Sequence, residues 1–165
     1  MSNGVDTRVP SIQEDLKQNK PFTGPSQEAY LGLIRAADDL RRRVSSLLEA
    51  EGVTLQQYNV LRILRGAGSD GLPTLAIGER MIERTPGVTR LIDRMENKGW
   101  VARERCTADR RRVWCRITGQ GLALLKPLDT PVNELDDILL EALDHEELAR
   151  FIDYLDRIRA RVDQG

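Results

Sequence analysis

The stretch TPGVTRLIDRMENKGWVARERCTADRRRVWCRI, residues 85–117, contains the strongest local signals in this sequence. Thr85 is a good N-cap residue, and Pro86 suits the first helical position, where a missing backbone N–H costs nothing. Apolar residues then recur at three- and four-residue steps from Val88 to Met95, which is the stripe of an amphipathic helix. We therefore expect a helix that begins at Pro86 and buries this stripe.

The second half of the stretch is typical of a β-hairpin. The sequence Asn97-Lys98-Gly99 is a helix stop. Residues 100–106 and 112–117 are rich in strand-forming types, and the polar link 107–111 lies between them. A hairpin is therefore predicted directly after the capped helix.

Helical patterns precede this stretch. Residues 30–48 contain an apolar stripe of helical period, and Thr54-Leu-Gln-Gln57 is a capping box that starts a second helix. A turn over 66–71 follows, and Thr74 is expected to cap a short helix that extends to about Met81. Residues 1–24 are polar with several prolines and glycines, and we interpret them as an extended arm.

Helical patterns also follow the hairpin. Thr118 starts a helix that Pro127 and Pro131 should kink or interrupt. The segment Asp144-His-Glu-Glu147 is a capping box with Asp as the cap, and it launches the final amphipathic pattern. The predicted fold is thus mainly α with one small β-hairpin, and the order of elements from 54 to 117 is that of a winged helix-turn-helix.

Charge is balanced globally but not locally. The chain has 25 Lys and Arg against 26 Asp and Glu, a formal charge of −1. Residues 80–116 contain 11 basic and 5 acidic residues, whereas residues 127–165 contain 4 basic and 11 acidic residues. Binding to nucleic acid requires only a local basic patch that displaces counterions from phosphates. A solvated, salt-bridged surface is the alternative interpretation of such charges.

Composition excludes several other classes of protein. No run of 18 apolar residues exists, so a membrane partner is not expected, and residues 1–20 lack the apolar centre of a secretory signal. Two cysteines and one histidine provide neither a disulfide framework nor a four-ligand zinc site. We therefore expect a cytoplasmic protein, associated with the nucleoid when bound to DNA, that uses no cofactor and no metal.

Five short motifs resemble the MarR family of transcription regulators. They are Gln57-Tyr-Asn-Val-Leu61, Val88-Thr-Arg-Leu-Ile-Asp-Arg-Met95, Lys98-Gly-Trp-Val101, Asp109-Arg-Arg111 and Ile117-Thr-x-x-Gly121. They occur in the correct order across residues 30–160. The resemblance implies a homodimer that binds double-stranded DNA at a pseudo-palindromic operator. Such proteins are usually repressors that a small ligand or oxidation releases.

The resemblance and the physics of groove recognition together give the candidate DNA-binding residues. The start of a recognition helix faces base edges in the major groove, and an arginine on the wing can enter a narrow minor groove. The candidates are Thr85, Thr89, Arg90 and Arg94 on the helix and Asp109, Arg110 and Arg111 on the wing.

The remaining expectations concern dimerisation and an effector. Three apolar stripes at 30–48, 122–142 and 148–162 exceed what one small domain could cover, so they predict a two-fold interface. Candidate interface residues are Leu33, Leu40, Leu148, Phe151, Leu155 and Ile158. By analogy with the family, a small aromatic or amphipathic effector would bind a cavity near Tyr58 or Arg62.

These expectations divide the chain into three parts. Residues 1–24 form the arm, 25–52 and 118–165 form the helical dimerisation region, and 53–117 form the winged helix-turn-helix DNA-binding domain. The winged helix-turn-helix therefore has dimerisation helices on both its N-terminal and C-terminal sides.

Alternative functions stay open. A redox-responsive regulator could use Cys106 and Cys115, which would lie across from each other if the hairpin were symmetric about Arg110 and Arg111. Neighbouring arginines could activate such thiolates. A small enzyme, or a helical interaction module without DNA binding, is the other possibility. The enzyme lacks support, because His145 has no nucleophile partner and the G-x-G-x-x-G at 66–71 follows a helix instead of a strand.

Overall fold

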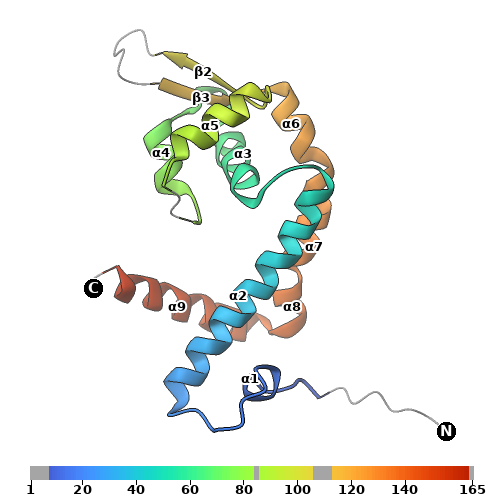
Figure 1. The fold of residues 1–165 in the computed structure, drawn as a ribbon, viewed down its shortest axis with the longest axis vertical. Coiled ribbons are helices and arrows are strands. Elements are labelled where there is room, and N and C mark those ends of the chain that lie inside the picture. The colour runs from blue at the N-terminus through green and yellow to red at the C-terminus, as the bar shows by residue number, and fades with distance from the viewer. Residues whose placement is uncertain (1–7, 84–85, 106–112, 164–165) are drawn as a thin grey trace, which may run out of the picture. The chain divides into compact units, whose positions relative to one another are not determined.

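The computed structural model describes residues 8–83, 86–105 and 113–163. The chain divides into two compact units, Met1–Arg43 and Val44–Gly165. Helix α1 (Ile12–Asp15) and most of α2 (Pro25–Ala50) belong to the first unit, and the later elements belong to the second (Figure 1).

Helix α1 is a difference from the expected extended arm. The Ser11 hydroxyl accepts a hydrogen bond from the Glu14 amide at 3.3 Å, and the Glu14 carboxylate accepts one from the Ser11 amide at 2.8 Å. This reciprocal pair is a capping box, which satisfies two amides that would otherwise lack partners. The expectation of an extended arm is therefore wrong at residues 12–15.

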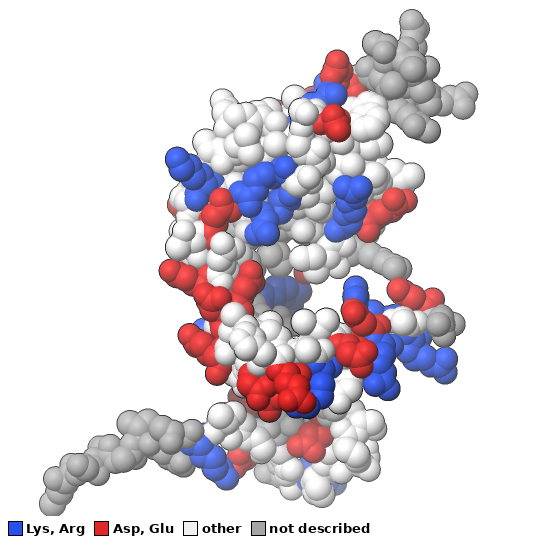
Figure 2. All heavy atoms as spheres, turned by 180° about the vertical axis from the view of Figure 1, so that it is seen from behind, with Lys and Arg blue, Asp and Glu red and all other residues white. Residues whose placement is uncertain are grey.

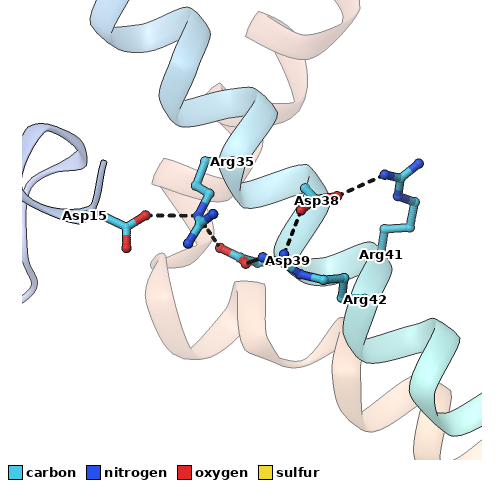
Figure 3. Close-up of polar contacts among 6 residues, drawn as sticks. All are labelled: Asp15, Arg35, Asp38, Asp39, Arg41 and Arg42. Atoms are coloured by element: carbon cyan, nitrogen blue, oxygen red, sulfur yellow. Dashed lines mark hydrogen bonds and ion pairs between the residues drawn. The ribbon is translucent and has the colours of Figure 1, made fainter. Parts of the chain in front are cut away.

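Charged side chains of the first unit pair with one another. Such interleaving of acidic and basic side chains is also visible across one face of the molecule in Figure 2. Figure 3 shows Arg35 of α2 between Asp15 and Asp39, with its Nε atom 2.9 Å and 3.4 Å from their carboxylates. Further along α2, Arg41 pairs with Asp38, and that hydrogen bond lowers the pKa of the aspartate. An ion pair thus joins α1 to α2.

Helix α3 (Leu55–Ala67) supplies much of the core of the second unit. It begins with the predicted capping box, in which Thr54 and Gln57 each accept a hydrogen bond from the other's backbone amide. Burial of each large aliphatic side chain stabilises the fold by roughly 1.5–3 kcal/mol. The fully buried core side chains are Leu48, Val60, Leu61, Leu64, Ile77, Ile92, Met95, Cys115 and Leu125.

A small antiparallel sheet follows the order β1-β3-β2. Its strands are β1 (Leu72–Pro73), β2 (Val101–Arg105) and β3 (Val113–Ile117), so the predicted hairpin is confirmed. Strand β1 lies after the short helix η1 (Gly68–Asp70), between the predicted turn over 66–71 and the helix predicted from Thr74, where no strand was expected. Two residues are too few to show the alternation of a strand.

The helices after the hairpin follow their sequence signals. Thr118 caps α6 (Gly119–Leu125), and its hydroxyl accepts from the Gly121 amide at 3.1 Å. Pro127 lies in a short 3-10 segment that interrupts the helical run, as expected, whereas Pro131 lies in the first turn of the next helix and does not divide it. Asp144 caps the last helix with a capping box. The elements after α6 are η2 (Lys126–Leu128), α7 (Asp129–Asp136), α8 (Ile138–Ala142) and α9 (His145–Val162).

One ion pair connects α3 to the start of α7. The Arg65 Nη1 atom lies 2.8 Å and 2.9 Å from the two carboxylate oxygens of Asp129. Both side chains are partly exposed, so the pair contributes at most about 1 kcal/mol. Across the described ranges, we find no helix with the length and apolar character that a membrane span requires.

Candidate nucleic-acid interface

Helices α4 (Thr74–Arg80) and α5 (Val88–Asn97) pack together beside the sheet, as Figure 1 shows. Helix α5 buries Leu91, Ile92 and Met95, as its stripe predicted. Thr89 and Arg90 lie on the opposite, exposed face, and Arg94 is exposed one turn later. The helix therefore presents small polar and basic side chains to solvent while its apolar face fixes its position.

The start of α5 differs from the predicted cap. The helix begins at Val88, and its N-cap is Gly87, which has φ +93° and makes no side-chain capping bond. A residue in this left-handed conformation interrupts a right-handed helix, so the helix cannot extend back to Pro86. The predicted start is therefore two residues too early. Thr85 lies outside the described residues, and its role stays a prediction.

Arg103 of β2 ties the hairpin to α5. Its Nε atom donates to Glu96 at 2.8 Å, and its guanidinium also bonds Asp93. Burial opposes the charge, but these two hydrogen bonds outweigh it and raise the pKa of Arg103. Sequence reasoning missed this role because Arg103 pairs with acidic residues on a different element, a contact that only the tertiary fold creates.

These ion pairs redistribute the basic charge that the sequence suggested. The charge of Arg103 is balanced by acidic side chains of α5, and Arg116 of β3 pairs with Glu104 of β2. Arg90 and Arg94 have no ion-pair partner in the part of the chain that the structure describes. The free basic charge of α5 therefore lies on its exposed face. The wing candidates Asp109, Arg110 and Arg111 fall in the segment outside the described residues.

A cavity of about 330 Å³ in the second unit is lined mainly by α3, α7 and the residues that follow α4. Its size is at the lower end of the range for small-molecule sites. Tyr58 is buried, and its hydroxyl accepts from Arg62 Nη1 at 2.9 Å, which raises the pKa of the arginine. The two predicted ligand residues thus lie together on one wall. The lining comprises Val44, Leu55, Gln56, Tyr58, Asn59, Arg62, Met81, Ile82, Glu83, Val132 and Asp136.

Cys115 does not have the surroundings of a reactive thiol. It is fully buried in β3, and burial raises the pKa of its thiol, against the opposing contact with Thr74 at 3.6 Å. Its cross-strand partner is Arg103. The expected pairing of Cys115 with Cys106 is therefore wrong. The register pairs Cys115 with a residue three positions earlier in β2 than the symmetric hairpin would require. Cys106 itself lies outside the described residues.

The candidate dimer residues lie on two helices. Leu33 and Leu40 are half-buried on α2. On α9, Leu148, Phe151 and Leu155 are half-buried and Ile158 is exposed. Helix α9 has no buried residue along its 18 positions, and large apolar side chains such as Val162 are strongly exposed. Among the described residues, none covers this apolar surface of α9.

Two helices that pack together, an exposed polar and basic face on the second of them, and a hairpin bonded to that helix define a winged helix-turn-helix DNA-binding protein. The model of the MarR family matches residues 53–113. The HTH-type transcriptional regulator FarR of Neisseria gonorrhoeae is 30% identical over 125 residues, which cover 76% of this chain and 84% of FarR. The chain belongs to the MarR family.

Solved structures agree with this assignment. A MarR transcription factor from Planctomyces limnophilus is 37% identical, with a TM-score of 0.62 over 82% of this chain and 98% of that one. The PcaV transcriptional regulator of Streptomyces coelicolor, in complex with its natural ligand, is 25% identical, with a TM-score of 0.65. The alignment with PcaV covers 84% of this chain and 93% of that one. These relatives are regulators of transcription and not enzymes.

Proposed function

We propose that this DNA-binding regulator is a repressor that binds a pseudo-palindromic operator as a homodimer, with α5 as its recognition helix. The observation that carries the proposal is the exposed face of α5, where Thr89, Arg90 and Arg94 stand on a helix anchored by its buried stripe. Arg90 reads base edges, and Arg94 contacts bases or phosphates. Residues 53–117 form the DNA-binding domain. Thr85 and the wing residues Asp109, Arg110 and Arg111 complete the interface.

The helical segments 25–52 and 118–165 form the dimerisation region. The support is the uncovered apolar face of α9, since exposed apolar surface of this extent marks an interface. A two-fold dimer places two α5 helices so that they read two half-sites of opposite orientation. This arrangement matches a pseudo-palindromic operator.

A small aromatic or amphipathic effector binds the cavity beside Tyr58 and Arg62 and releases the DNA. Two observations support this part: the cavity combines an apolar lining with a guanidinium, and the relative PcaV was solved with its natural ligand. The effector must bind the DNA-incompetent state more tightly than the competent one. Thermal-shift screening with aromatic acids tests this effector site. If no compound in a broad library stabilised the protein, the site would be unsupported.

The DNA-binding proposal is tested by comparing variants on an operator selected from random sequence. Arg90→Ala should weaken the operator by about 1–3 kcal/mol and affect random DNA much less, because a lost base contact costs specificity. Arg111→Ala should weaken both DNAs similarly and lower the salt slope by about one, as a wing arginine senses charge and groove width.

Arg150→Ala is the matched control. It removes one exposed arginine from α9, where Arg150 pairs with Glu146, and should leave both affinities nearly unchanged. If Arg90→Ala lowered the affinity for both DNAs equally, α5 would not be the reader. If the wild-type chain selected no sequence and showed no salt-dependent binding, the repressor proposal itself would be wrong.

A further inference from the structure

A side chain of another helix accepts a hydrogen bond from the backbone of the turn that follows α4. Helix α4 ends at Arg80, and its C-cap Met81 has an extended backbone, with φ −67° and ψ 138°. The next amide, that of Ile82, donates a hydrogen bond to the side-chain oxygen of Asn59 on α3 at 3.0 Å. The Met81 amide still bonds back to the Gly78 carbonyl of α4, whereas the Ile82 amide finds its acceptor in Asn59.

In the sequence, Met81 and Ile82 come shortly before the recognition helix, which begins at Val88. Met81 is buried, so its side chain anchors one end of the turn in the core. Ile82 is 86% exposed, and its side chain therefore contributes little packing that could hold the backbone in place. The bond to Asn59 thus fixes the position of the backbone six residues before α5 begins at Val88.

The same contact lies in the wall of the cavity. Asn59, Met81 and Ile82 all line it, together with Tyr58 and Arg62. The two residues that make this bond therefore both contribute to the wall of the cavity in which the proposed effector binds.

We propose that Asn59 is a positioning residue for DNA recognition: through Ile82 it holds the turn that sets where α5 enters the major groove. The inference rests on the proposed role of α5 and adds the route by which the cavity reaches that helix. If the Asn59–Ile82 contact favours DNA binding, linkage requires that bound DNA favours the contact in turn. No contact between Asn59 and DNA is required.

The first test compares two substitutions of Asn59. Asn59→Ala removes the acceptor, whereas Asn59→Asp replaces the amide oxygen with a carboxylate oxygen that can also accept a hydrogen bond. We expect Asn59→Ala to weaken the selected operator about fivefold to thirtyfold, the effect of about one hydrogen bond, with random DNA of equal length much less affected. Asn59→Asp should retain the ratio of operator to random affinity within about twofold.

Gln56→Ala is the matched control, because Gln56 lies on the same helix and lines the same cavity. It removes a side-chain amide there while the Ile82 amide keeps its partner, so operator affinity should stay close to that of the wild type. Equal losses for Gln56→Ala and Asn59→Ala would mean that any change in this wall disturbs α5. The specific assignment to Asn59 would then be overturned.

Amide hydrogen exchange measured by NMR reports the contact itself. In the wild-type chain we expect the Ile82 amide to be protected, and more so when the operator is bound. Asn59→Ala should lose this protection while the amides of Val60 and Leu61, in the core of α3, stay protected and show that the fold is intact. Asn59→Asp should restore the protection.

The outcomes distinguish a failure of the positioning role of Asn59 from a failure of the proposed DNA-binding function. Faster Ile82 exchange in Asn59→Ala together with unchanged operator affinity would overturn the positioning role. If Asn59→Ala failed to fold, the wild-type measurement would decide, since Ile82 protection that does not rise on operator binding also overturns it. Failure of the wild-type chain to bind any DNA would instead refute the proposed function.

Discussion

Space around single residues constrains this fold as strongly as their chemistry. A Cβ atom on Gly121 of α6 would lie 2.4 Å from the carbonyl oxygen of Trp100 and 2.8 Å from Ile117 Cγ1. The first of these contacts is to backbone, which cannot rotate away. Only glycine allows α6 to approach the hairpin this closely, and a Cβ on Gly66 of α3 would meet nothing within 4 Å.

Gly121→Ala should destabilise the protein by about 1–3 kcal/mol, the usual cost of overpacking a tight contact. Gly66→Ala is the same chemical change in open space and should instead stabilise α3 by about 0.5–1 kcal/mol, because alanine favours helix. Urea unfolding of the two variants measures both effects. Equal and small changes would show that α6 can shift to admit a methyl group.

Sequence predicted the buried residues of the recognition helix but not all of its environment. The spacing of Leu91, Ile92 and Met95 identified the core face because a helix returns to the same side every three to four residues. The left-handed conformation of Gly87 carries no such periodic signal. Arg103 could not be assigned either, since its acidic partners come from another element.

Among the elements, the two that were predicted from a capping box began where expected. The boxes at Thr54 and Asp144 fixed the starts of α3 and α9, whereas the cap expected at Thr85 did not give the start of α5. The Ser11–Glu14 box follows the same rule, yet it was hidden in a polar segment without an apolar stripe. Strand β1 was missed because its partner β3 is far away in sequence.

The stability of α1 should depend on pH. The Ser11 amide, then the Arg8 guanidinium, lowers the pKa of Glu14, so the folded helix favours the carboxylate. This contribution is complete above the ordinary value of 4.5 and is lost as pH falls through the lowered pKa. NMR chemical shifts of residues 12–15 should therefore lose helical character in acid. Glu14→Gln keeps an acceptor oxygen without titrating, and its shifts should not follow the same curve.

At the scale of the whole molecule, the uncovered face of α9 makes the proposed function depend on a second copy of the chain. Leu155→Glu should place a charge in this face and convert the dimer to a monomer, which light scattering measures. Operator affinity should fall with it, because one chain reads only one half-site.

Ala149→Glu is the matched control, since it adds the same charge at an exposed position of the same helix. It should stay dimeric and keep its operator affinity. A Leu155→Glu protein that remains dimeric with full affinity would place the interface elsewhere on the chain.

The buried thiol of Cys115 can also serve as a probe of how readily the sheet opens. Its sulfur is sealed inside the central strand of the sheet, so an alkylating reagent reaches it only during the moments when the sheet opens. With Cys106 replaced by serine, the rate of labelling reports how readily the sheet opens. Arg103 lies opposite Cys115 in the register and bonds Glu96 of α5, so this rate reports on the strand pair that is joined to the recognition helix.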